Sequence, residues 1–372
     1  MHLTALLSIA VLATPAAAQR PTAPAPAEPA SAAPADQAAI ARARTFIRDT
    51  MTALGAPGAG VTVMRAGRVI WSEGFGFADL EQGVPVTPLT RFRVGSVSKS
   101  LTSAAVGLLV ESGRLDLDAP IQRYVPSFPV KRWPITTRLV AGHLAGIRHY
   151  RGENEMVVHR TYPDVTTALD IFAADSLLFE PGTRFSYSSF GYNLLSAVVE
   201  RAAGEPFLQF MERRVFDAVG LRHTTPDHVD SIVPHRARWY TRGPRGGGIV
   251  NAPATDNSYK WAGGGFLSTT EDLVTFGDAL LHGRLLKPET VRLLWTSQQL
   301  RDGKASGYGI GWFTRKDEQG RLVVFHSGGS VGGTAMLMIY PDQDLIIAVL
   351  VNSDSTFVGA TATVAGMFLD GR

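Results

Sequence analysis

The chain has 372 residues, of which 45% are hydrophobic and 19% charged, a balance typical of a globular protein rather than a disordered one. Its formal net charge is +3, and no basic run resembles a nucleic-acid or polybasic membrane patch, which argues against nucleic acid as a partner. It has no cysteine, so disulfides, zinc–thiolate sites, iron–sulfur clusters and cysteine nucleophiles are excluded. The nine histidines show no metal-ligand spacing, and we expect neither a metal nor a cofactor.

The N-terminal segment is typical of an exported protein. Residues 1–18 combine an apolar stretch with small residues before Gln19, which predicts a signal peptide. The stretch is preceded by His2 rather than by Lys or Arg, so a short anchor or an interfacial helix remains an alternative. Residues 19–37 are rich in Pro and Ala and predict an extended linker. We expect a secreted or periplasmic protein with no transmembrane span after signal removal and one large domain over 38–372.

The first part of that domain predicts a helix followed by a β-hairpin. Apolar residues recur with helical spacing over 36–53. Two β-rich runs follow within 58–79, and the Gly in the segment 65–68 between them is a hairpin signal. From Ser98 onward the apolar residues again have helical spacing, and Gly113 ends the pattern as a C-cap.

The rest of the chain mixes helices and strands, and the segment of about 120–255 combines short helical patterns with long connections rich in Gly, Pro and Arg. Helices are predicted over 192–204, 206–220, 269–283 and 357–369, with Thr269 or Thr270 as a cap, and strands over 307–315, 321–329, 333–341 and 345–353. Strands at both ends imply an α/β (α+β) fold, in which helices flank an antiparallel sheet and about 120–255 forms an inserted, mainly helical lobe. A cleft between the two parts is the expected site.

One short stretch, "GSVSK" at residues 95–99, carries a pair that can do chemistry. Ser96 lies at the expected start of a helix, and Lys99 follows three residues later, on the same face. A serine hydroxyl needs a base to become a nucleophile, and a lysine can serve when desolvation or nearby cations lower its pKa. The helix start also favours developing negative charge. A Ser-x-x-Lys match occurs by chance about once in a chain of this length, so further motifs must decide.

A second serine motif competes with this pair. Residues 328–332, "GGSVG", match the G-x-S-x-G nucleophile elbow of α/β-hydrolases. That elbow requires a strand-to-helix turn at the serine and a histidine later in the chain. Here the last histidine is His326, and the residues after Ser330 predict a strand. Ser330 is therefore not the expected nucleophile.

Five collinear motifs carry a family resemblance. They are "GSVSK" at 95–99, "HLAGIRHY" at 143–150, "FEPGTRFSYSSFGYNLLSAVVERAAG" at 179–204, "GGGFLSTTEDLVTFGDALL" at 263–281 and "HSGGSVGG" at 326–333. In order and spacing they resemble the serine β-lactamase-related family, which includes class C β-lactamases, D-alanyl-D-alanine carboxypeptidases, family VIII-type esterases and LACTB-like serine proteases. The resemblance covers about residues 38–370 and implies a β-lactamase/transpeptidase-like fold.

The resemblance also implies roles for individual residues. Ser96 resembles the acylating nucleophile, Lys99 its base, and Tyr187 the tyrosine of the Tyr-x-Asn element, which passes a proton to the leaving group. A tyrosine beside a lysine ammonium is expected to have a lowered pKa. The backbone N–H groups of Ser96 and Gly329 are expected to form the oxyanion hole. The expected substrate-binding residues are Ser189, His326, Ser327 and Gly328.

Two positions depart from the family pattern. Ser189 stands where the Tyr-x-Asn element has Asn, and His326 stands where the Lys-Thr-Gly element has Lys. A hydroxyl is shorter than the amide that contacts a substrate amide, and a mostly uncharged histidine attracts a carboxylate weakly. Both changes favour a LACTB-like peptidase or an esterase over an efficient β-lactamase. The segments 150–165 and 240–260 are expected to influence specificity.

The sequence therefore predicts an exported serine hydrolase that forms an acyl-enzyme at Ser96 and acts on a peptide, amide or ester, with weak β-lactam hydrolysis as a further option. The alternative is a non-catalytic penicillin-recognising sensor or scaffold. Under that alternative Ser96 would be a plain helix cap and Tyr187 a core tyrosine. His143 is expected to pack beneath the site in a structural role. Neither the substrate nor the oligomeric state follows from the sequence.

Overall fold

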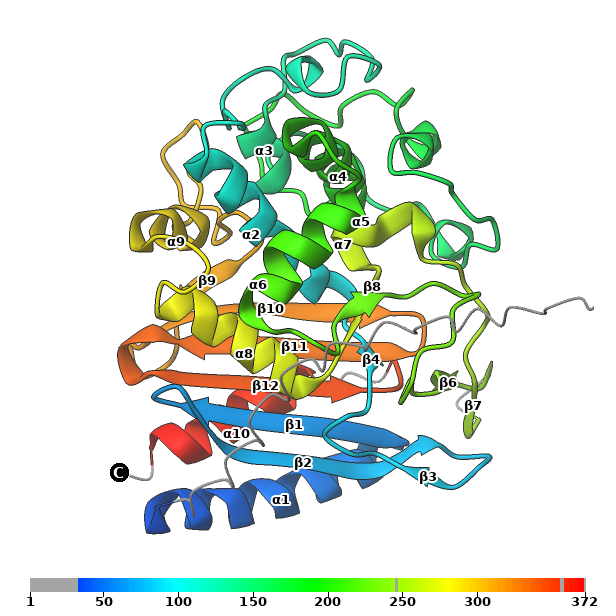
Figure 1. Cartoon of the computed structure of the whole chain (residues 1–372), viewed down its shortest axis with the longest axis vertical. Helices are drawn as coiled ribbons and strands as arrows, with labels where there is room; N and C mark the ends of the chain where they lie inside the picture. The colour runs from blue at the N-terminus through cyan, green and yellow to red at the C-terminus, as the bar shows by residue number, and fades with distance from the viewer. Residues whose placement is uncertain (1–32, 245–246, 355–357, 371–372) are drawn as a thin grey trace, which may run out of the picture. The chain divides into compact units, whose positions relative to one another are not determined.

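The computed structural model describes residues 33–244, 247–354 and 358–370 (Figure 1). The predicted signal peptide, 1–18, and residues 19–32 of the predicted linker lie outside these ranges. Ser31–Arg372 forms one compact unit, which includes the predicted lobe of about 120–255. Within the described ranges, no helix has the length and apolar character that crossing a bilayer requires.

A seven-stranded antiparallel sheet has the strand order β3-β2-β1-β12-β11-β10-β9. Its strands are β1 Gly58–Arg65, β2 Arg68–Asp79, β3 Val84–Pro85, β9 Phe313–Lys316, β10 Leu322–Ser330, β11 Gly333–Tyr340 and β12 Leu345–Val351. The two ends of the chain meet where β1 pairs with β12, with Ala59 opposite Val351. The predicted hairpin turn forms with positive φ at Ala66 and Gly67, as a two-residue turn between right-twisted strands requires.

The central strands separate two hydrophobic cores. Along β12, Ile346, Ala348 and Leu350 belong to the core on one face of the sheet, and the residues between them belong to the other core. This alternation follows from the two-residue period of a strand. Because both faces are covered, all seven residues of β12 are buried and apolar.

Helices cover both faces of the sheet. Helices α1 and α10 pack together on one face, and α8 lies on the other with the remaining helices beyond it (Figure 1). The α-helices are α1 Pro34–Leu54, α2 Ser98–Glu111, α3 Thr137–Ala141, α4 Ser189–Ala203, α5 Phe207–Phe210, α6 Asp217–Val219, α7 Trp261–Gly264, α8 Thr270–Leu281, α9 Pro288–Trp295 and α10 Val358–Leu369. The predicted α/β (α+β) fold, an antiparallel sheet flanked by helices, is confirmed.

Several predicted elements differ from those in the structure. Helix α1 begins at Pro34 because proline suits the first turn of a helix, so residues 34–37 are helical rather than part of the linker. The predicted helix over 206–220 contains a π-helical stretch, Met211–Phe216, between α5 and α6. The predicted strand over 307–315 is regular only in β9, because Gly307 and Gly311, which both precede β9, adopt positive φ.

Two small sheets complete the fold. Strands β4 Phe92–Arg93, β8 Phe266–Ser268 and β5 Thr225–Pro226 form one, and β6 Tyr240–Arg242 and β7 Ile249–Asn251 form the other. Pairing of β4 with β8 brings the segment before α2 beside the segment after α7. The Val94 N–H extends this contact by donating to the Phe266 carbonyl oxygen at 3.1 Å. The fold thus places residues 95–99 and 261–264 next to each other.

Candidate active site

Ser96 lies in a tight turn that runs into α2. The turn is a short 3-10 helix, Gly95–Val97, and α2 follows it directly. Gly95 has a left-handed φ of 49°, and a Cβ atom there would lie 2.6 Å from the carbonyl oxygen of Gly329. Only glycine meets both conditions without moving the turn away from β10. The Ser96 side chain remains partly accessible.

Lys99 lies one helical turn further on, and its side chain is fully buried. Its Nζ is 3.1 Å from the Ser96 Oγ, 2.6 Å from the Gly263 carbonyl oxygen and 3.3 Å from the Ser189 Oγ. A neutral amine has two N–H donors and one lone pair. With the N–H donors directed to Gly263 and Ser189, the lone pair is available to accept the hydroxyl proton of Ser96.

The surroundings of Lys99 favour this neutral form. Burial lowers the pKa of Lys99 well below 10.5, and the charge of the nearby Lys260 lowers it further. Across the described ranges, no carboxylate forms a salt bridge with the Lys99 Nζ to offset that loss of hydration. The rings of Tyr187 and Tyr192 lie 4.9 and 5.3 Å from the Nζ. Lys99 therefore has the properties of a general base.

Tyr187 lies just before α4, next to the Ser96 side chain. Burial raises the pKa of Tyr187 above 10. The expectation of a lowered pKa is wrong, because the burial of Tyr187 outweighs its polar contact with Ser96, and the desolvated Lys99 favours its neutral form. Tyr187 is therefore a neutral phenol that can donate and accept a proton, rather than a phenolate.

The Tyr187 segment is held against the segment 143–149 by a pair of histidines. The Ser188 N–H donates to the Nδ1 of His143 at 3.1 Å, and the next N–H, of Ser189, donates to the Nδ1 of His149 at 3.1 Å. The Ser188 hydroxyl also donates to the Arg148 carbonyl oxygen at 2.7 Å. The centroid of the His143 ring lies 4.3 Å from that of the Tyr187 ring, with the two rings tilted. His143 thus packs beneath the site, where the sequence predicted a structural role.

Strand β10 borders the site with a free edge. Its partner β9 reaches only to Phe325, whereas the other edge of β10 stays paired with β11 through Ser330. Beyond Phe325 this edge is paired with no strand of the described residues and packs instead on the turn before α2. A Cβ atom on Gly328 would lie 2.0 Å from the Val94 carbonyl oxygen. Gly329 is exposed. Its backbone lies beside the turn that carries Ser96, as the expected oxyanion pair requires.

His326 is neutral and buried at this edge. Its Nδ1 donates to the Ser327 carbonyl oxygen at 2.6 Å, and its Nε2 accepts from the Tyr308 hydroxyl at 3.0 Å. Burial lowers the pKa of His326 to about 3. The imidazole therefore provides no positive charge for a substrate carboxylate. Of the other two residues expected to bind substrate here, Ser327 is partly accessible and Gly328 is buried.

Ser189 is also buried, with only 4% of its surface exposed. Its hydroxyl oxygen accepts a hydrogen bond from the Lys99 Nζ and lies next to Tyr150. The structure places Ser189 behind the base rather than on an accessible surface. Ser189 therefore contacts Lys99, whereas the family resemblance implied that it contacts the substrate.

The structure adds residues that sequence reasoning did not assign. Gly263 accepts a hydrogen bond from Lys99, and Tyr192 contacts the same Nζ through its ring. Lys260 is buried in the turn before α7, close enough to lower the pKa of Lys99. Gly263 lies in a motif already recognised, but a backbone contact leaves no signal in the residue type.

The competing serine, Ser330, lies at the tip of a hairpin. Strand β11 follows β10 after a short turn, so no helix follows Ser330. Its hydroxyl is buried, and no hydrogen-bond partner for it occurs in the described ranges. The geometry of a nucleophile elbow is absent at this position.

Accessible groups mark the open side of the site. Ser96, Tyr187 and Ser327 are partly accessible, and His149 and Gly329 are exposed. A separate cavity of about 820 Å³ lies at the other face of the sheet, where residues of α10, β9 and β10 line it. None of the site residues borders that cavity.

Comparisons with known proteins identify the family of this chain. The sequence model of the beta-lactamase family matches residues 43–367. The human mitochondrial serine beta-lactamase-like protein LACTB is 31% identical over 438 residues, covering 89% of this chain and 80% of that protein. A D-stereospecific amidohydrolase from Streptomyces sp. superposes with a TM-score of 0.75 at 25% identity, covering 89% of this chain and 99% of that one. EstCE1, a hydrolase with promiscuous acyltransferase activity, gives a TM-score of 0.76 at 25% identity over 91% of this chain and 99% of its own. The chain belongs to the beta-lactamase family of serine hydrolases.

Proposed function

We propose that this protein is an exported serine hydrolase that forms an acyl-enzyme at Ser96 from a peptide, amide or ester substrate. The observation that carries the proposal is the 3.1 Å contact between the Lys99 Nζ and the Ser96 Oγ. Lys99 is fully buried there and its pKa is lowered well below 10.5. Burying a lysine without a carboxylate partner costs stability, whereas an acyl-transfer enzyme needs such a base.

Acylation begins with proton transfer from the Ser96 hydroxyl to the neutral Lys99 amine. The Ser96 oxygen attacks the substrate carbonyl carbon and forms a tetrahedral intermediate. The neutral Tyr187 phenol then protonates the leaving nitrogen or oxygen as its bond to carbon breaks. Lys99 returns the proton to Tyr187, so the acyl-enzyme forms with both groups in their starting states.

Two backbone N–H groups, of Ser96 and Gly329, stabilise the negative charge of the intermediate. In a comparable site, the loss of one such donor lowers kcat about 10²–10³-fold. Deacylation repeats the sequence with water as the nucleophile, with Lys99 and Tyr187 removing its proton. Release of the acid restores the free Ser96 hydroxyl.

The charge of the site supports neutral substrates over carboxylate-bearing ones. His326 is neutral, with a pKa of about 3, and it is buried. LACTB at 31% identity, an amidohydrolase and the hydrolase EstCE1 are among the similar proteins, which supports amide and ester chemistry. We infer a LACTB-like peptidase or an esterase, with β-lactam hydrolysis as a weak activity.

We also propose export, with residues 1–18 as a cleaved signal peptide and the following Pro/Ala-rich segment as a tether. The test is the intact mass of the protein recovered from the periplasm or medium of a bacterium that expresses the full chain. A mature N-terminus at Gln19 is expected. Full-length protein retained in the cell or membrane would contradict the cleaved signal.

The test of catalysis is intact mass after a short incubation with a fluorophosphonate. The wild type is expected to gain one adduct, and Ser96→Ala to gain none. Ser330→Ala is the matched control, because it removes the competing motif serine and is expected to keep the adduct. Turnover of 4-nitrophenyl acetate, nitrocefin and a D-Ala-D-Ala peptide then identifies the activity as esterase, β-lactamase or peptidase. A wild type with neither adduct nor turnover would favour the non-catalytic penicillin-recognising module.

A further inference from the structure

Because Ser189 is buried, no side chain at its position can contact the polar groups of a substrate. The Ser189 hydroxyl is buried against Lys99 and Tyr150, so Ser189 presents no polar group to a bound substrate. A substrate with polar groups beside its scissile bond nevertheless needs hydrogen-bond partners, because unpaired polar groups in a binding site cost free energy. The question is which accessible side chain near Tyr187 can supply one.

His149 lies at the required place. Its ring is 5.6 Å from the ring of Tyr187 in an edge-on arrangement and packs 4.4 Å from the ring of Tyr150. The residue is exposed, unlike His143 and His326, which are buried. It is therefore the one histidine of this group that a substrate can reach.

The hydrogen bond to Ser189 determines which ring nitrogen of His149 carries the proton. The Nδ1 accepts the Ser189 N–H at 3.1 Å, so it holds a lone pair and the proton of a neutral ring lies on Nε2. Desolvation against the neighbouring rings lowers the pKa of His149 to about 4, so the ring is neutral at physiological pH. No acceptor for the Nε2–H occurs in the described parts of the chain. This donor is thus oriented, neutral and unused.

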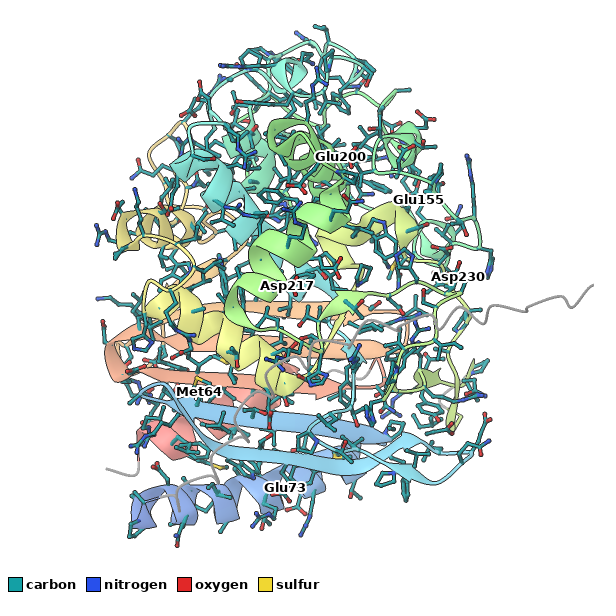
Figure 2. The ribbon with its side chains drawn as sticks, in the orientation of Figure 1. Met64, Glu73, Glu155, Glu200, Asp217 and Asp230 are labelled. Atoms are coloured by element: carbon teal, nitrogen blue, oxygen red, sulfur yellow. The ribbon has the colours of Figure 1, made fainter. Side chains whose placement is uncertain are left out.

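The backbone around His149 is held in place. Arg148 forms ion pairs with Glu155 at 2.8 Å and Asp175 at 2.6 Å. Glu155, labelled in Figure 2, lies beside the turn before α7, and its carbonyl oxygen accepts the Tyr259 hydroxyl at 2.8 Å. A donor on a fixed segment loses little conformational entropy when it binds a substrate.

We propose that His149 is a specificity-determining residue, whose Nε2–H donates to a carbonyl oxygen of the acyl part of the substrate, next to the scissile bond. The preferred substrates are then peptides and N-acylated amino-acid esters rather than plain alkyl esters. We assign the contact to the acyl part because that part stays on Ser96 through both chemical steps, after the leaving group has departed. The inference rests on the proposed acyl-enzyme at Ser96.

Two esters with the same leaving group and the same chain length test the proposal. 4-Nitrophenyl N-acetylglycinate carries the amide carbonyl, and 4-nitrophenyl pentanoate replaces that amide by methylene groups. The measured quantity is the ratio of their kcat/KM values, divided by the ratio of their rates of hydrolysis by hydroxide. The wild type is expected to give a corrected ratio well above one. A corrected ratio near one would overturn the proposal without any variant.

His149→Asn and His149→Gln separate recognition from structure. The Asn oxygen can occupy the place of Nδ1 and accept the Ser189 N–H, but no donor remains at the place of Nε2. The Gln amide offers a donor near the place of Nε2 and loses the acceptor. One lost hydrogen bond corresponds to about a tenfold fall in the corrected ratio for His149→Asn. His149→Gln is expected to keep most of the ratio, even where it is less stable.

Two results contradict this assignment. An unchanged corrected ratio in His149→Asn would show that the amide is not recognised by the Nε2–H. A fall in His149→Gln with no fall in His149→Asn would show that His149 acts only by holding Ser189, because Asn keeps the acceptor for the Ser189 N–H. If the wild type hydrolyses neither ester faster than Ser96→Ala, the proposed function fails, and the substrate assignment fails with it.

Discussion

The Nζ of Lys99 and the carbonyl oxygen of Gly263 lie 2.6 Å apart and join α2 to α7 inside the protein. This contact uses one N–H of the amine and directs the rest of the group towards Ser96. A charged ammonium at this position would need more than one neutral carbonyl to replace its hydration. The geometry thus favours a neutral base over a structural cation.

Replacing the base should remove activity without removing the fold. In Lys99→Met the fluorophosphonate adduct is expected to form about 10³-fold more slowly, because Ser96 has no proton acceptor. Thermal unfolding should occur at an equal or higher temperature, because a buried amine is exchanged for a side chain with no hydration to lose. Time-resolved intact mass measures the labelling rate, and calorimetry measures the unfolding temperature. A variant that labels at the wild-type rate would show that Lys99 is not the base.

The rate should depend on pH through Lys99. The pKa of Lys99 is lowered well below 10.5, and only the neutral amine accepts the Ser96 proton. We expect kcat/KM for 4-nitrophenyl acetate to rise with pH through one ionisation well below 10.5 and to fall as the pH is lowered through it.

The same profile distinguishes Lys99 from Tyr187. Burial raises the pKa of Tyr187 above 10, so a tyrosinate base would make the rate climb only above pH 10. Tyr187→Phe is expected to lower the plateau and keep the midpoint. A midpoint near 10.5 in the wild type, or one that disappears in Tyr187→Phe, would contradict this assignment.

The sequence predicted the nucleophile and the base because their relation is local. Ser96 and Lys99 are three residues apart at a helix start, and helical geometry alone brings them together. The five motifs also indicated the fold and the place of Tyr187, and the strands at both chain ends predicted the sheet in which β1 pairs with β12.

Sequence reasoning could not provide contacts that depend on long-range packing. The pairing of Lys99 with the Gly263 carbonyl oxygen crosses more than 160 positions and involves a backbone atom. The pKa of Tyr187 differs from the expectation because the sequence does not show that burial desolvates the Tyr187 side chain itself. The role of His149 depends on a tautomer that is fixed by one N–H of Ser189.

The close approach of Gly95 to Gly329 should be essential for catalysis. In Gly95→Ala the new Cβ would lie 2.6 Å from the Gly329 carbonyl oxygen, so the turn and β10 must separate. Movement of an oxyanion donor is expected to lower kcat about 10²-fold or more. The measurement is kcat with 4-nitrophenyl acetate.

Gly113→Ala is the matched control for that variant. Gly113 also has a positive φ, of 67°, but no atom lies within 4 Å of the Cβ position. Both variants pay the cost of a left-handed alanine, about 1–2 kcal/mol in stability, and only Gly95→Ala meets the clash. An equal loss of kcat in the two variants would attribute the effect to backbone strain and not to the oxyanion edge.

Lys260 should make the stability of the protein depend on pH. Burial, together with the charge of Arg93, lowers the pKa of Lys260 to about 7. Between pH 7 and the ordinary value of 10.5 the unfolded chain binds a proton that the folded chain does not. The free energy of unfolding should therefore rise with pH across this window. Below pH 7 the full cost of burying the charged Lys260 should be present.

Lys260→Met is expected to raise the unfolding temperature at pH 7 and to flatten this rise, because methionine carries no proton to lose. Each pKa unit corresponds to about 1.4 kcal/mol, so the effect should be a few kcal/mol and easily measured. Thermal unfolding of both proteins from pH 7 to pH 10 gives the two slopes. Lys304→Met, at an exposed lysine, should keep the wild-type slope. Equal slopes in the wild type and Lys260→Met would show that Lys260 keeps its charge inside the folded protein.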